Sequence, residues 1–136
     1  MAIYKIFPLQ DATLYSGHPV MNTGIDAILE VSSTYPFTVA NPIVARPLIQ
    51  FDQSQINNVI DTLNTGSTSI SASLKTFISD ASGVVMQSEI YVYPSSGSWN
   101  NGSGEYLDNP STVNGVGWEY RSNSGSNPWL TDNFEE

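Results

Sequence analysis

Hydrophobic and polar positions alternate most regularly on either side of a short turn in the middle of the chain. Residues 69–79 (SISASLKTFIS) and 84–93 (VVMQSEIYVY) place apolar side chains mainly at every second position. A period of two is that of a β-strand with one face toward an apolar core. The four residues between the runs, Asp-Ala-Ser-Gly, suit a hairpin connection. The pattern predicts a β-hairpin centred on Gly83.

Elsewhere the chain predicts shorter strands and a single helix. Strand patterns occupy residues 3–7, 27–33 and 48–52, the last of them directly after Pro47. One stretch differs, because its apolar residues fall at helical spacing (i, i+3, i+4 and i+7): Ile56, Val59, Ile60 and Leu63. We predict a helix over about residues 54–64, with Ser54 as its cap and Gly66 as its stop.

Residues 95–128 are rich in Ser, Gly, Asn and Pro, yet large aromatic residues are spaced through them. Disordered segments are poor in aromatic residues, so we expect a long loop that folds back and anchors its rings, with one strand candidate at 116–121. Short strands, one connecting helix and many turns predict an all-β fold: an antiparallel β-sandwich of jelly-roll type. We expect residues 1–136 to form a single domain.

Composition excludes several functions. The 136 residues carry a net charge of −9, with four scattered Lys and Arg, which argues against nucleic-acid binding. No apolar run is long enough for a membrane span, and the start lacks a secretory signal. Zero cysteine and a single histidine, His18, exclude thiolate chemistry and a multi-histidine zinc site. No carboxylate pair or nucleophile motif is singled out, so we predict a protein that is not an enzyme.

Two sets of residues are candidates for binding. Hard oxygen donors in loops make Asp11, Asp26 and Asp108 weak candidates for a structural calcium ion, although their spacing forms no regular calcium loop, and otherwise we expect no cofactor. Four aromatic residues could contact a glycan or a protein partner: Trp99, Tyr106, Trp118 and Trp129. We favour the alternative, in which these rings anchor the loops.

Two charged residues near the predicted helix have alternative interpretations. Asp52 precedes the helix, and we expect it to cap the helix or the turn before it. Arg46 either pairs with a carboxylate, such as that of Asp52 or Asp11, or is an exposed strand charge.

Six segments in order carry a resemblance to a known family: DATLYSGHPVMNTG (11–24), RPLIQFDQSQI (46–56), ISASLKTFI (70–78), and IYVYP, SWNNGSG and NGVGWEYR within 90–121. They resemble the DNRLRE-type (disaggregatase-related) β-sandwich domain, a jelly roll similar to carbohydrate-binding modules and found in secreted, cell-surface and phage structural proteins. The chain departs from that family at PWLTDNFEE (128–136), where the family continues with further strands. Either the chain is the N-terminal part of a longer protein, which we expect, or a partner completes the sheet by strand addition.

The resemblance and the composition together lead to a functional expectation. Ser, Thr and Asn number 41 while charged residues make up only 12%, a low-charge surface typical of virion proteins. We expect a non-enzymatic phage structural protein, such as a capsid decoration, appendage or tail/fibre-attachment module. It would be made in the host cytoplasm without a signal peptide and would assemble with other virion proteins or with copies of itself. The alternative is an extracellular or cell-surface carbohydrate-binding (adhesin) module that recognises glycans.

Overall fold

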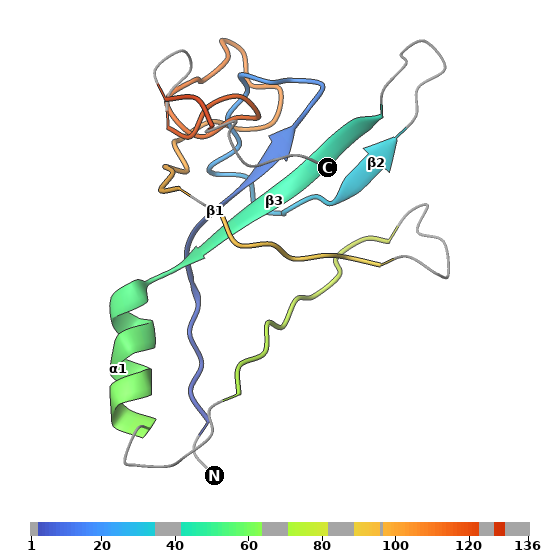
Figure 1. Cartoon of the computed structure of the whole chain (residues 1–136). Coiled ribbons are helices and arrows are strands. Elements are labelled where there is room, and N and C mark those ends of the chain that lie inside the picture. The colour runs from blue at the N-terminus through green and yellow to red at the C-terminus, as the bar shows by residue number, and fades with distance from the viewer. Residues whose placement is uncertain are drawn as a thin grey trace.

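A small antiparallel sheet organises the computed structural model, which describes residues 3–34, 42–63, 71–81, 89–95, 97–122 and 127–129. Its strands are β1 (Pro8–Tyr15), β2 (Ser32–Thr34) and β3 (Ile43–Phe51), and the helix α1 (Gln53–Leu63) follows β3 directly (Figure 1). The order in the sheet is β1-β3-β2, and both pairings are antiparallel. The structure is therefore β-rich with one short helix.

The register of β1 and β3 explains why a proline is tolerated in the central strand. Thr13 lies opposite Pro47, but its backbone N–H and C=O point out of the sheet, where both bind the hydroxyl of Thr23. The Thr13–Pro47 pair is thus one of the alternate pairs of an antiparallel ladder that exchange no hydrogen bonds. Pro47 has no N–H to donate, and the β1–β3 ladder loses nothing by its presence.

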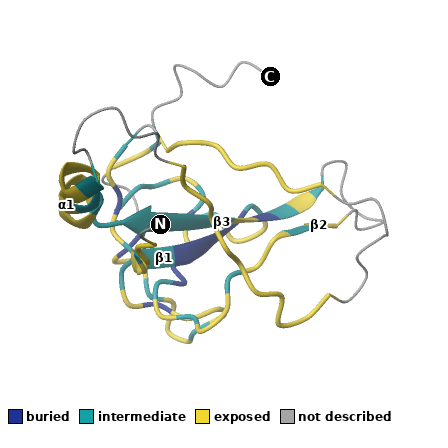
Figure 2. Ribbon diagram, turned by 90° about the horizontal axis from the view of Figure 1, so that it is seen from below, coloured by how far each residue is buried: buried dark blue, intermediate teal, exposed yellow. Residues whose placement is uncertain are grey.

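The core forms where the loop of residues 97–122 folds back on the β1 side of the sheet. Ala12 and Leu14 of β1 pack with Trp99 and Val116, and three half-buried residues surround this cluster: Leu48, Trp118 and Trp129. A second, smaller cluster joins Tyr15, Met21 and Ala45. Burial is accordingly concentrated along β1 and the middle of β3, whereas α1 remains at the periphery (Figure 2). The prediction that the aromatic-rich loop anchors its rings is confirmed for the three tryptophans.

The predicted helix is confirmed, with each boundary shifted by one residue. The prediction that Ser54 caps it is wrong, because Asp52 precedes the first helical residue and its carboxylate Oδ1 accepts the Ser54 N–H at 2.8 Å and the Ser54 hydroxyl at 2.7 Å. These hydrogen bonds, first the hydroxyl and then the N–H, lower the pKa of Asp52. Asp52 is therefore the N-terminal cap that we expected as its role.

Several strand predictions differ from the structure. Residues 71–81 and 89–93, the described parts of the predicted hairpin, run as extended chain in Figure 1 but belong to no strand, and the rest of the hairpin with Gly83 lies outside the described residues. The first strand begins at Pro8, after the predicted 3–7 segment, and only the end of 27–33 pairs. Predicted strand 116–121 provides one isolated bridge, between Tyr120 and Pro128. Among the described residues the sheet has three strands.

Candidate functional site

Asn22 is the centre of the loop cluster that covers β1. Its side chain is completely buried. The amide Nδ2 donates to the carbonyl oxygens of Asn101 and Val116, while Oδ1 accepts the Gly104 N–H at 2.7 Å and the Gly24 N–H at 3.4 Å. One amide thus satisfies backbone groups from three separate loop segments, and Asn22 holds those segments together.

Glycines surround Asn22 because the backbones approach too closely for side chains. A Cβ atom at Gly115 would lie 2.4 Å from the Asn22 Nδ2, and one at Gly104 would lie 2.5 Å from the Asn22 carbonyl oxygen. Gly102 has a φ of 73°, a conformation that favours glycine. Asn22 and these glycines form what we call the asparagine knot, which fixes the loop of residues 97–122 on the sheet.

The four aromatic candidates do not form one platform. Trp99 is buried in the core, and Trp129 is half-buried with its indole N–H donating to the Gly117 carbonyl at 3.0 Å. Trp118 is also half-buried, and the guanidinium of Arg46 lies 5.3 Å from its ring centroid. Arg46 therefore stacks on an indole, and the described residues show no carboxylate paired with it.

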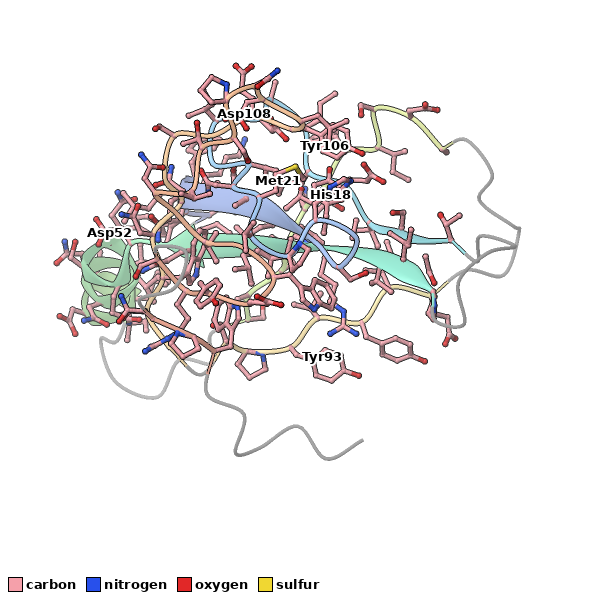
Figure 3. All side chains as sticks on the ribbon, turned by 90° about the horizontal axis from the view of Figure 1, so that it is seen from above. His18, Met21, Asp52, Tyr93, Tyr106 and Asp108 are labelled. Carbon is pink, nitrogen blue, oxygen red and sulfur yellow. The ribbon has the colours of Figure 1, made fainter. Side chains whose placement is uncertain are left out.

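Tyr106 lies apart from the tryptophans, on Tyr15. The two ring centroids are 4.9 Å apart, and His18 packs edge-on to Tyr106 at 6.1 Å. His18, Met21 and Tyr106 gather on one side of the sheet in Figure 3, and Tyr93 lies on the opposite side. Burial first, and then the charge of Glu30, raise the pKa of Tyr15, whose hydroxyl donates to Glu30 at 3.1 Å.

The three calcium candidates have different surroundings. Asp26 Oδ1 accepts the Tyr106 N–H at 3.1 Å, and both oxygens of Asp108 accept the Thr112 N–H, at 3.1 and 2.9 Å. Hydrogen bonding from Thr112 lowers the pKa of Asp108. Asp11 lies on β1 opposite Ile49. Within the described ranges, no group of three acidic or histidine side chains is arranged to hold a metal ion.

Two shallow depressions lie on the surface of the described residues. The first, of about 330 Å³, is lined by Ser98, Trp99, Asn100, Arg121, Ser122 and Asn127. The second, of about 360 Å³, is lined by Tyr15, Asp26, Ala27, Ile28, Glu105 and Tyr106. Both are open, and the first is lined mainly by hydroxyl, amide and guanidinium groups.

Large apolar side chains are strongly exposed in the two extended segments. Phe77 is 94% exposed, Ile78 80%, Val92 76% and Tyr93 79%. These segments carry the alternating pattern that predicted the hairpin, and such a pattern is otherwise found where one face of a strand is covered. Leu74, Ile90 and Tyr91 in the same segments are exposed as well.

No family model matches the chain, and searches of curated proteins and of solved structures also find no match. The resemblance to the DNRLRE-type domain therefore stays a prediction. In the part of the chain that the structure describes, no helix is long and apolar enough to cross a membrane.

Sequence reasoning missed the asparagine knot. One hint was available, because two Asn-Gly pairs, at 101–102 and 114–115, occur in the same loop whose glycines the knot requires. Nothing in the sequence distinguishes Asn22 from the chain's other asparagines, since its distant partners are backbone groups 79 to 94 residues away.

Proposed function

We propose that the chain is a non-enzymatic structural protein of a phage particle, a decoration, appendage or tail/fibre-attachment module that works through protein–protein assembly. The observation that carries the proposal is the exposure of Phe77, Ile78, Val92 and Tyr93 in segments with a strand pattern. Soluble proteins rarely leave a large contiguous apolar patch uncovered, and such patches commonly mark protein interfaces. Covered in the assembled protein, these segments would complete a sandwich of jelly-roll type, as the DNRLRE-type resemblance implies.

The magnitudes favour an assembly over an isolated chain. Burial of a large apolar side chain contributes about 1.5–3 kcal/mol, so covering these four would contribute on the order of 6–12 kcal/mol. Association of two proteins costs roughly 4–15 kcal/mol before any contact contributes. A single contact of this size is marginal, whereas repeated contacts between many tethered copies, as in a particle, become strong together.

The carboxylates support a structural role. Asp26, Asp52 and Asp108 each accept backbone N–H groups, of Tyr106, Ser54 and Thr112 respectively. In Asp52 and Asp108 hydrogen bonding lowers the pKa and holds the carboxylate in its charged form. That arrangement suits the stabilisation of turns and helix ends, and a general acid requires the opposite shift.

A second candidate function, glycan binding, is favoured by the depression beside Trp99. Its lining of Ser98, Asn100, Arg121, Ser122 and Asn127 offers hydroxyl, amide and guanidinium groups of the kind that bind sugar hydroxyls. Trp99 itself is buried beneath it, so any recognition would rely on these polar groups more than on stacking.

Two experiments test these functions. Mass spectrometry and immunogold labelling of purified phage particles should detect the chain at a fixed copy number. A chain that stays a soluble monomer and is never found in particles would refute the structural role. A glycan array tests the alternative, with Asn127→Ala as the variant and the exposed helix substitution Asn57→Ala as the matched control. Uniform silence with folded protein would exclude glycan binding.

A further inference from the structure

The central strand β3 has an open edge along its second half. On one side β3 pairs with β1 along nearly its whole length, but on the other side β2 covers only Ile43–Ala45. Within the described residues, the stretch from Arg46 to Phe51 has no strand on that side.

The ladder geometry shows which backbone groups this edge presents. Because the Thr13–Pro47 pair exchanges no hydrogen bonds, the backbone of Pro47 faces away from β1, and so do those of Ile49 and Phe51 at the same parity. The β2 pairing agrees, since Ala45 and Ile43 share that parity and face β2. Pro47 offers only a carbonyl, whereas Ile49 and Phe51 each offer an N–H and a C=O.

The segment of residues 89–93 is extended but belongs to no strand (Figure 1). The Tyr91 hydroxyl donates to Glu89, and the Tyr91 and Tyr93 rings stack at 6.5 Å between centroids. Residues two apart share a face only in an extended chain, so the odd residues lie on one side. Ile90 and Val92, which are 71% and 76% exposed, lie on the other.

We propose that residues 89–93 of a second copy of this chain add to the open edge of β3 as a fourth strand, antiparallel to it. This rests on the proposed assembly function and names the partner. With Val92 opposite Ile49, an antiparallel pairing would place Ile90 opposite Phe51 and Tyr93 opposite Leu48, and Pro94 ends the segment where a strand must stop. Among the described residues the segment belongs to no strand and its apolar side chains are exposed, and none of those residues pairs with the second half of β3 on that side.

Charge favours a second copy although each chain carries −9. Residues 47–51 contain no charged side chain, and Glu89 is the one charge in residues 89–93. Edge strands that must avoid pairing usually carry charges, above all Lys. Here the edge carries only Arg46, at its start, and the segment carries only Glu89, so the two surfaces hold no like charges and can meet with little repulsion. The even residues Ile90 and Val92 would then lie beside the side chains of Ile49 and Phe51 on one face.

Disulfide trapping tests this pairing, because the chain has no cysteine of its own. One preparation carries Ile49→Cys and a second carries Val92→Cys, and the two are mixed in a glutathione redox buffer. A disulfide between chains is expected for Val92→Cys and not for Tyr91→Cys, whose side chain would face the other way. Equal trapping of both would indicate undirected collision and overturn the proposal.

A doubly substituted chain, Ile49→Cys with Val92→Cys, distinguishes exchange from folding back. At low concentration it should form no internal disulfide, and an internal disulfide in the monomer would overturn the proposal. Phe51→Cys has the same parity and replaces Ile49→Cys if that variant does not fold.

Sedimentation of the otherwise unsubstituted chain provides an independent measurement. Val92→Pro removes an N–H that would face β3, and we expect it to weaken self-association about tenfold or more. Tyr91→Pro removes an N–H that faces away, so its effect should be much smaller. Equal effects would refute the strand pairing. If particles contain the chain but no disulfide forms between chains, the strand pairing is refuted and the structural role stands. If disulfides form between chains but the chain is never found in particles, the structural role is refuted and the strand pairing stands.

Discussion

Replacement of Asn22 is the most informative test of the fold. Asn22→Ala removes the partner of the Gly104 N–H and of the Asn101 and Val116 carbonyls at a site with no solvent exposure. Each buried polar group left without a partner costs about 1–3 kcal/mol. We expect a loss of about 3–5 kcal/mol in the free energy of unfolding, since water entering the small cavity restores part of the lost bonding.

The measurement is urea unfolding followed by tryptophan fluorescence, because Trp99, Trp118 and Trp129 all pack against the core that the knot holds in place. The matched control is Asn57→Ala, which removes an exposed hydrogen bond from Gln53 on α1. It should change stability by less than about 0.5 kcal/mol. A loss below about 1 kcal/mol for Asn22→Ala would refute the role assigned to the knot.

Asn22→Asp adds a pH signature to the same test. It places a carboxylate oxygen where an N–H₂ group faced two carbonyls, so the folded protein should favour the protonated acid and raise its pKa. A group whose folded-state pKa lies above the unfolded value of about 3.9 contributes stability at pH values below about 3.9. This stability is lost as the pH rises through the folded-state pKa. Asn22→Asp should therefore be destabilised most near neutral pH, whereas the deficit of Asn22→Ala should not follow that titration.

Three further outcomes follow from other residues. Gly115→Ala should cost about 1–3 kcal/mol because its Cβ would meet the knot at 2.4 Å, whereas Gly17→Ala would meet only a movable Ile43 side chain at 3.2 Å and should be nearly neutral in urea unfolding. The pKa of Asp52 is lowered, so its cap stabilises the fold at pH values above the ordinary carboxyl pKa. This stability is lost as the pH falls through the folded-state pKa. Asp52→Asn should retain the helical circular dichroism signal but lose this pH dependence, and an unchanged dependence would contradict the cap. The pKa of Tyr15 is raised, so the protonated Tyr15 hydroxyl contributes stability below about pH 10. This stability is lost as the pH rises through the folded-state pKa of Tyr15. Glu30→Gln should shift the 295 nm titration of Tyr15 to lower pH, and Tyr15→Phe should abolish that part of the curve.

Local patterns predicted the elements whose stability is local. The helix was predictable from Ile56, Val59, Ile60 and Leu63 because a stripe at helical spacing, with a cap before it, specifies a helix with few distant contacts. The middle strand was predictable only in part. Pro47 suggested a strand start, but Pro47 is harmless inside β3 once its neighbour Thr13 turns its backbone outward.

Long-range contacts decide what the sequence pattern left open. Residues 71–81 and 89–93 have strand patterns without strand partners, because pattern specifies the conformation that a segment favours and not whether another strand is present to pair with it. The prediction that the aromatic residues anchor the loop was correct for the three tryptophans, which pack in or against the core. Tyr106 packs on Tyr15 instead, and that location depends on a contact across 91 positions of sequence.

The hydroxyl of Thr23 makes the hydrogen bonds to the Thr13 backbone that a neighbouring strand would otherwise make. It donates to the Thr13 carbonyl at 2.7 Å and accepts the Thr13 N–H at 2.9 Å, so it closes the outer margin of β1. The outer edge of β1 is therefore occupied at Thr13, whereas the second half of β3 is open on its other side among the described residues. In the pairing proposed above, each copy would accept a strand there and donate its own residues 89–93 to another copy, a head-to-tail contact that closes into a ring where the rotation between copies permits.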